Sequence, residues 1–100
     1  MNLRDLEYLA AVGELKHFRK AAEKCFVSQP TLSGQLKKLE TYLGVQLVER
    51  NTRSVFLTPI GEEIVKTART ILADAASIEN MAATFSDPMC GTLNIGLIPT

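Results

Sequence analysis

The sequence predicts a mainly α-helical fold in which three helices and a β-hairpin precede one long helix. Three segments before residue 44 carry apolar residues at the spacing of a buried helix face. Between residues 45 and 58, two runs of β-type residues flank a polar, turn-forming stretch. Residues 59–86 carry an apolar heptad repeat. A chain of 100 residues, 46% of them hydrophobic, has room for one domain with a buried core.

Composition excludes several classes of protein. The sequence has no apolar run of the ~18–20 residues that a membrane span needs. Its amphipathic N-terminus does not resemble a signal peptide. Cys25 and Cys90 lie far apart with no metal-ligand spacing, which favours a reducing cytoplasm over a disulfide framework. We therefore expect a cytoplasmic protein with no membrane partner and no metal or other cofactor.

The first two helices are predicted over residues 3–15 and 18–25. In the first, Asn2 is a candidate N-cap, Gly13 weakens the far end, and the expected buried face contains Leu3, Leu6, Leu9 or Ala10, and Val12. In the second, one side carries Phe18, Ala21, Ala22 and Cys25, and the other carries Arg19, Lys20, Glu23 and Lys24. The small alanines allow another helix to cross closely.

The third helix is predicted to begin after Ser28, an N-cap residue, with Pro30 in its first turn and Gly44 at its end. Its apolar stripe consists of Leu32, Leu36, Leu39 and Leu43. The opposite face is small or hydrogen-bonding near the N-terminus and basic further along. On this face, Gly34 lowers the stability of the helix by about 1 kcal/mol relative to Ala. Either close approach to a nucleic-acid groove or a tight helix crossing would explain a glycine at this position.

The charges are unevenly distributed although the net charge is zero. Residues 16–58 hold eight Lys and Arg against three Asp and Glu, a net charge of +5, whereas residues 59–100 carry −3. A basic helical module with a hairpin is typical of the winged helix-turn-helix, which binds double-stranded DNA. The expected DNA contacts lie on the second helix, the third helix and the hairpin tip: Arg19, Lys20, Ser28, Gln29, Pro30, Thr31, Ser33, Gly34, Lys37, Lys38, Arg50 and Arg53.

The long helix is predicted to be a dimerisation helix. Its a/d seam is too long for a 58-residue domain to cover, and the alanines permit close helix approach. The seam contains Ile64, Ala68, Ile71, Ala75, Ile78, Ala82 and Phe85. We expect a winged helix-turn-helix domain at 1–58, a linker helix at 59–87, and at 88–100 a hinge with the first strand of a further, C-terminal regulatory domain that this chain lacks.

Two functions from different classes fit these features: a DNA-binding and dimerisation module, or a winged-helix protein-interaction module that binds no DNA. Binding through several phosphates weakens steeply with salt, which separates them. An enzyme is not expected, because His17 has no catalytic partner pattern, Glu62 and Glu63 diverge on their helix, and Cys25 is placed as an inert core thiol. His17 is expected to be exposed, or to lie near a phosphate.

Several motifs resemble those of LysR-type transcriptional regulators. They are Phe18–Glu40 with its Val27-Ser28-Gln29-Pro30 core, Leu43–Arg50, and Leu57-Thr58-Pro59-Ile60-Gly61, and the resemblance covers about residues 1–90. Residues 1–9, 31–35 and 96–100 narrow it to peroxide-sensing members of the family. The resemblance implies a recognition helix reading DNA through Gln29, Pro30, Thr31 and Ser33, a wing arginine at Arg53, and a linker helix, Pro59–Ser86, that pairs two subunits.

The resemblance also implies the setting of a bacterial transcriptional activator of the oxidative-stress response. The family's sensing domain would begin near Leu93, and the redox cysteines lie within that domain. The longer protein is expected to form a homodimer through the linker helix and a tetramer when complete, to contact RNA polymerase, and to associate with the cytoplasmic nucleoid.

Overall fold

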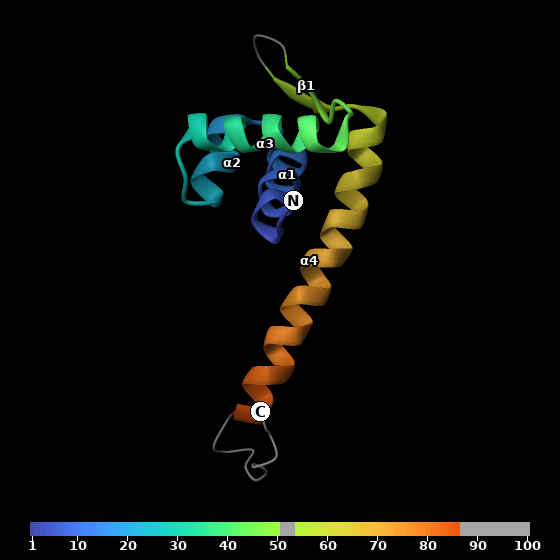
Figure 1. The fold of residues 1–100 in the computed structure, drawn as a ribbon. Helices are drawn as coiled ribbons and strands as arrows, with labels where there is room; N and C mark the ends of the chain where they lie inside the picture. The colour runs from blue at the N-terminus through green and yellow to red at the C-terminus, as the bar shows by residue number, and fades with distance from the viewer. Residues whose placement is uncertain (51–53, 87–100) are drawn as a thin grey trace.

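The computed structural model describes residues 1–50 and 54–86 and has the predicted order of elements (Figure 1). Three helices, α1 (Leu3–Leu15), α2 (Phe18–Lys24) and α3 (Gln29–Leu43), pack together. Strands β1 (Val48–Arg50) and β2 (Val55–Leu57) form the hairpin, and α4 (Pro59–Ser86) follows. The fold is thus a winged helix-turn-helix with a long C-terminal helix, as predicted.

Side-chain caps fix the starts of the first three helices. Asn2 forms a capping box with Asp5, in which each side chain accepts a hydrogen bond from the other residue's backbone N–H. His17 caps α2, because its Nδ1 accepts from the backbone N–H of Lys20 at 3.2 Å. Ser28 caps α3 by accepting from the backbone N–H of Thr31. Ser28 was predicted in this role, whereas His17 was not.

The hairpin is joined to both neighbouring helices at its base. β1 and β2 pair antiparallel, with Val48 opposite Leu57 and Arg50 opposite Val55. One carboxylate oxygen of Glu40, on α3, accepts hydrogen bonds from the backbone N–H groups of Leu47 (2.8 Å) and Val48 (3.1 Å). These bonds fix the start of the wing relative to the end of α3.

The wing also continues directly into α4. The hydroxyl of Thr58 accepts a hydrogen bond from the backbone N–H of Gly61 and lies within hydrogen-bond distance of the Gln46 and Leu47 carbonyls. A Cβ at Gly61 would overlap the Leu47 carbonyl oxygen. Only glycine therefore permits Leu47, the residue before β1, to pass this close to the first turn of α4.

The core lies where α1, α2, α3 and the hairpin meet, and its fully buried side chains include Leu9, Leu32, Leu36 and Leu47. Two details of the predicted α1 face were wrong. Leu3 is exposed, and Tyr8 is buried. Gly13 also has a packing role beyond weakening the helix, because its position lies against Leu57 and Val65 and lets α1 approach β2 and α4.

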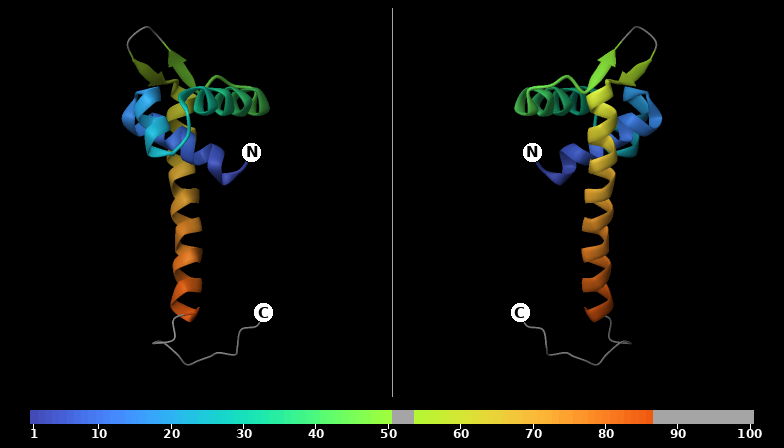
Figure 2. Two further views of the ribbon diagram at one scale, coloured as in Figure 1. Left: turned by 90° about the vertical axis from the view of Figure 1, so that its left-hand side faces the viewer. Right: turned by 90° about the vertical axis from the view of Figure 1, so that its right-hand side faces the viewer.

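Helix α4 packs on α1 through its first turns and then projects away from the rest of the molecule (Figures 1 and 2). Val65 and Ala68 are buried in the packed part, whereas Ile78 and Phe85 in the projecting part are exposed. Within the described ranges, none of the helices is both long enough and apolar enough to span a membrane.

Candidate nucleic-acid interface

The exposed face of α3 gathers most of the residues predicted to contact DNA. The buried Leu32, Leu36 and Leu39 orient the helix, so that the predicted contacts occupy its other sides. Ser33 is half-buried, and the remaining predicted residues of this segment are exposed: Ser28, Gln29, Pro30, Thr31, Gly34, Lys37 and Lys38. Hydrogen-bonding groups therefore lie at the helix N-terminus and ammonium groups one to two turns later, an order that suits base edges and phosphates.

Gly34 lies in open space on this face. A Cβ built there meets no atom within 4 Å. Among the described residues, no other helix approaches this position, so a tight helix crossing does not explain the glycine. Close approach by an outside molecule is the explanation that stays open.

A shallow groove runs along the second half of the same face. Gly34, Lys37, Lys38, Thr41 and Tyr42 line it, and its volume is about 490 Å³. Tyr42 was not selected from the sequence, yet it is 70% exposed. An exposed aromatic side chain beside two lysines was the signal that could have identified it. The groove offers a phenol hydroxyl and two cations to an anionic partner.

Helix α2, which precedes α3 in the chain, carries three cations on its basic side, and these cations have different partners. Lys24 pairs with Glu14 of α1 at 2.6 Å, and Arg19 lies 3.6 Å from Glu23. The hydrogen bond from Lys24 also lowers the pKa of Glu14. Lys20 and Arg19 are exposed, as predicted for residues that approach a phosphate backbone.

The wing carries Arg50 on β1. Its guanidinium carbon lies 5.0 Å from the centroid of the Phe18 ring, a cation–π contact between the wing and the start of α2. Arg50 was predicted from the sequence to contact DNA. The contact with Phe18 leaves the exposed side chain able to meet a phosphate as well. Arg53 lies outside the described residues.

Helix α3 and the wing lie at one end of the molecule, and the C-terminal end of α4 lies at the other (Figure 2). Along α4, most predicted seam residues are exposed or half-buried: Ile64, Ile71, Ala75, Ile78, Ala82 and Phe85. Ala68 is a correction. It is only 1% exposed within the single chain, because α4 packs on α1 there, so its side chain belongs to the monomer core and not to a seam.

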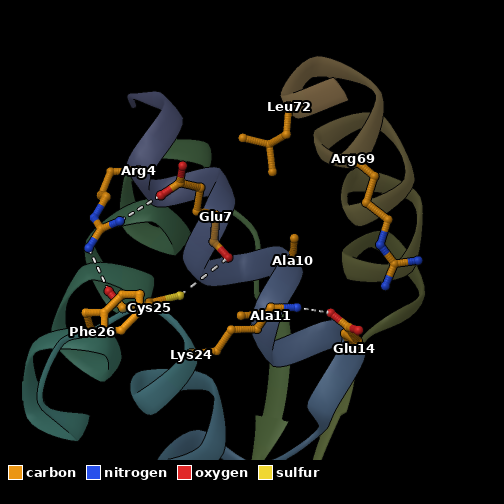
Figure 3. Close-up of a pocket in the computed structure, with 10 residues that line it drawn as sticks. All are labelled: Arg4, Glu7, Ala10, Ala11, Glu14, Lys24, Cys25, Phe26, Arg69 and Leu72. Atoms are coloured by element: carbon orange, nitrogen blue, oxygen red, sulfur yellow. Dashed lines mark hydrogen bonds and ion pairs between the residues drawn. The ribbon is translucent and has the colours of Figure 1, made fainter. Parts of the chain in front are cut away.

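A second groove, of about 410 Å³, lies between α1, the α2–α3 turn and α4 (Figure 3). Cys25 is buried beside it, with Sγ 3.9 Å from the Glu7 carbonyl oxygen, and burial raises the pKa of its thiol. Arg4 closes one side by donating to the Cys25 carbonyl oxygen at 2.7 Å and to Glu7 at 2.9 Å. The thiol is therefore placed as an unreactive core group. Cys90 lies outside the described residues.

No group of three or more His, Cys, Asp or Glu side chains able to hold a metal ion occurs within residues 1–50 and 54–86. The features that these ranges do bring together are a polar and basic helix face, a wing with an arginine, and a long apolar helix.

Comparison with known sequences places the chain among bacterial regulators. The family of bacterial regulatory helix-turn-helix proteins of the lysR type matches residues 3–62. The chain is 54% identical over its full length to the hydrogen peroxide-inducible genes activator of Pectobacterium carotovorum. It is equally similar to the DNA-binding transcriptional dual regulator OxyR of Escherichia coli K12. In both cases the chain spans 33% of the relative's length.

Solved structures agree with the sequence comparison. A full-length OxyR variant from Pseudomonas aeruginosa superposes with a TM-score of 0.83 at 45% identity, covering 87% of this chain and 30% of that one. The DNA-binding domain of BenM in complex with its benA site 1 DNA superposes with a TM-score of 0.81 at 39% identity, covering 87% of this chain and 98% of that one. The chain resembles OxyR throughout its length, and it belongs to the LysR family of bacterial regulatory helix-turn-helix proteins.

Proposed function

We propose that this chain is the sequence-specific DNA-binding and dimerisation module of a transcriptional regulator of the peroxide response. The observation that carries the proposal is the exposed face of α3, on which hydrogen-bonding residues precede Lys37 and Lys38 while the leucines of the opposite side are buried. Ser28, Gln29, Pro30, Thr31 and Ser33 contact base edges in the major groove. Lys37 and Lys38 contact phosphates.

The wing and α2 extend the proposed contact. Arg50, held at Phe18, and Arg53 lie along the adjacent minor groove or its phosphates, while Arg19 and Lys20 meet the backbone on the other side of α3. A relative whose structure contains DNA, the BenM DNA-binding domain, superposes on most of this chain and supports the proposal.

The test starts from duplexes selected out of a random pool by the 100-residue chain. Binding of a labelled selected duplex and of a scrambled duplex is then measured by fluorescence anisotropy over a range of NaCl concentrations. We expect the logarithm of the binding constant to fall by about 0.9 per phosphate contact for each tenfold rise in salt. If no duplex can be selected, or if the chain binds neither duplex, the result would favour the winged-helix protein-interaction module that binds no DNA.

Two substitutions separate base contacts from phosphate contacts. Ser33→Asn should weaken binding to the selected duplex by about 1–3 kcal/mol and leave the scrambled duplex nearly unchanged. Lys37→Ala should weaken both duplexes and reduce the salt slope by about one phosphate. Lys66→Ala removes the same charge from α4, away from α3, and serves as the matched control. An equal loss on both duplexes for Ser33→Asn would contradict the base contact.

We further propose that two copies pair through antiparallel α4 helices, because Ile71, Ile78 and Phe85 form an exposed stripe on a helix that leaves the domain. Ile71→Asp should make the chain monomeric in sedimentation experiments, whereas Ala73→Asp, on the opposite side of α4, should not. A wild-type chain that sediments as a monomer at high micromolar concentration would overturn the dimer.

For the longer protein we propose a cytoplasmic, nucleoid-associated activator that forms tetramers and contacts RNA polymerase. We also propose that residues 1–100 have no catalytic activity and hold no cofactor. The support is the similarity to regulators named for induction by hydrogen peroxide, of which this chain spans a third. Footprinting of the full-length protein under oxidising and reducing conditions would show whether its contacts on DNA change with redox state.

A further inference from the structure

The groove on the second half of α3 has polar groups that the chain itself does not use. Lys37 and Lys38 have no ion-pair partner among the described residues, and the Tyr42 hydroxyl has no hydrogen-bond partner there. The residues that line the groove include no carboxylate. Asp5 lines the neighbouring pocket beside Lys38 and Tyr42, but its carboxylate accepts a hydrogen bond from the backbone N–H of Asn2. Two ammonium groups and one phenol are therefore available to an outside anion.

Gly34 leaves the middle of this groove open. A Cβ there would meet no atom of the chain within 4 Å, so a partner can come close to the backbone of α3. Lys38 and Tyr42 follow Gly34 at intervals of four residues and lie on the same side of the helix. The remaining lining residue, Thr41, already donates its hydroxyl proton to the Lys37 carbonyl oxygen at 3.0 Å. The free donors of the groove are thus the phenol and the two ammonium groups.

The depth of the DNA major groove determines which part of the DNA these donors meet. The major groove is about 8.5 Å deep, and an α-helix rises about 1.5 Å per residue. An α3 that enters by its N-terminal end, as proposed above, spans this depth in about six residues. Counted from Gln29, the first residue of α3, the side chains of residues 37–42 then lie at the level of the sugar–phosphate backbone. The anion that fits the groove is a phosphodiester.

We propose that the groove formed by Gly34, Lys37, Lys38, Thr41 and Tyr42 is the seat of one phosphate of the DNA backbone, to which the Tyr42 hydroxyl donates a hydrogen bond. The inference rests on the proposed DNA contact of α3 and adds a neutral donor to it. Tyr42 lies 13 residues beyond Gln29, about 20 Å along the helix. Base contacts at one end of α3 and a held phosphate near the other end fix both the depth and the tilt of the helix on DNA.

The salt dependence of binding separates the phenol from the lysines. Tyr42→Phe removes only an exposed hydroxyl, so α3 should fold unchanged. The variant should bind both the selected and the scrambled duplex about tenfold more weakly for each bound copy, the lower range for a hydrogen bond to a charged group. Because the phenol is neutral and displaces no counterion, the salt slope should equal that of wild type. Lys38→Ala should also weaken both duplexes but should reduce the slope by about one phosphate contact.

Thr41→Val is the matched control for the loss of a hydroxyl. Thr41 belongs to the same groove, but its hydroxyl proton is bonded to the Lys37 carbonyl oxygen and is not offered to a phosphate. Its affinity for either duplex should therefore differ from that of wild type by less than twofold. Urea denaturation of Tyr42→Phe, Lys38→Ala and Thr41→Val checks that the fold is intact in each variant.

A methylphosphonate scan locates the phosphate. Each phosphate of the selected duplex is replaced in turn by a methylphosphonate, which is neutral. The wild-type chain should lose affinity at several of these positions. At one position in each half-site, the loss should be at least threefold smaller for Tyr42→Phe than for wild type, because the hydrogen bond to that phosphate is already absent. At the other positions the two chains should lose affinity equally.

The outcomes separate this seat from DNA binding itself. A weaker Tyr42→Phe with an unchanged salt slope and coupling at one phosphate supports the seat. Wild-type affinity of Tyr42→Phe, or a loss without coupling at any single phosphate, would overturn the seat and leave DNA binding standing. A loss confined to the selected duplex would indicate a base contact and overturn it as well. If the wild-type chain selects no duplex, the proposed function and the seat fail together.

Discussion

The guanidinium of Arg50 lies over the ring of Phe18, so that one contact joins the wing to the first residue of α2. The two residues are 32 positions apart in the sequence and come from elements that share little other contact. Beside the hydrogen bonds of Glu40 and Thr58 at its base, the wing therefore has a further contact at Phe18, a residue that is not itself predicted to touch DNA.

Replacing Phe18 should disturb the wing through Arg50. Phe18→Leu keeps an apolar side chain at the edge of the core but removes the aromatic face, with a loss of about 0.5–1 kcal/mol for an exposed cation–π contact. The DNA salt slope should then change toward that of Arg50→Ala. A double-mutant cycle over Phe18→Leu and Arg50→Ala measures the coupling. Strict additivity of the two effects on DNA affinity would show that Phe18 does not position the arginine.

Gly34→Ala should have opposite effects on stability and on DNA binding. A Cβ at this exposed helical position meets nothing in the chain, so the variant should unfold with a free energy about 1 kcal/mol higher. If α3 enters a groove closely, the added methyl group should weaken binding to the selected duplex. Urea denaturation and anisotropy measure the two quantities. Unchanged DNA affinity in the stabilised variant would contradict close approach at Gly34.

Glu40→Ala should loosen the wing. Its carboxylate accepts hydrogen bonds from two backbone N–H groups, at Leu47 and Val48, and their loss should cost about 1–3 kcal/mol of stability. Glu40→Gln keeps an acceptor oxygen and should be destabilised less. Thermal unfolding compares the two variants, and hydrogen exchange at residues 47 and 48 should rise in the alanine variant. Equal stability of wild type and Glu40→Ala would contradict this role.

The Cys25 thiol should resist alkylation in the folded chain. Burial raises its pKa, so little thiolate is present near neutral pH, and the side chain is covered. Iodoacetamide should modify Cys25 slowly at pH 8 and rapidly in urea, as followed by mass spectrometry of a Cys90→Ser variant. Rapid modification of the folded chain would contradict the buried placement.

The raised pKa of Cys25 also affects how the free energy of unfolding changes with pH. Because the folded pKa is raised, the neutral thiol contributes stability below the pKa of the unfolded thiol, about 8.5. That contribution is lost as the pH rises from there through the folded pKa. Cys25→Ala should therefore lose less stability than wild type between pH 8 and pH 10 in urea denaturation. An identical alkaline decline in both proteins would contradict the linkage.

The elements were predictable from sequence because local signals agreed with the tertiary structure. Ser28 and Pro30 mark the start of α3 and Gly44 marks its end. The spacing of its leucines identifies the buried side, and the candidate DNA-binding face is the side opposite. The heptads of α4 likewise gave its length. Such predictions rest on residues close together in the chain.

Contacts between distant elements were not predictable in the same way. Ala68 has seam spacing, but α1 covers it, and periodicity cannot tell an intramolecular neighbour from a partner. The roles of Gly13 and Gly61 depend on Leu57 and Leu47, which approach them only in the folded chain. The cation–π contact of Arg50 with Phe18 likewise has no signal in the spacing of either residue.

The unbroken course of α4 makes it a lever for the winged domain. Thr58 and Gly61 join the wing to its first turn, and the helix then runs 28 residues, about 42 Å, to Ser86. A tilt of about 5° at the far end of such a lever moves the near end by about 4 Å, close to the 3.4 Å rise of one base pair in duplex DNA. Small angular changes at residue 86 are thus amplified into displacements of α3 on the scale at which DNA sequence is read.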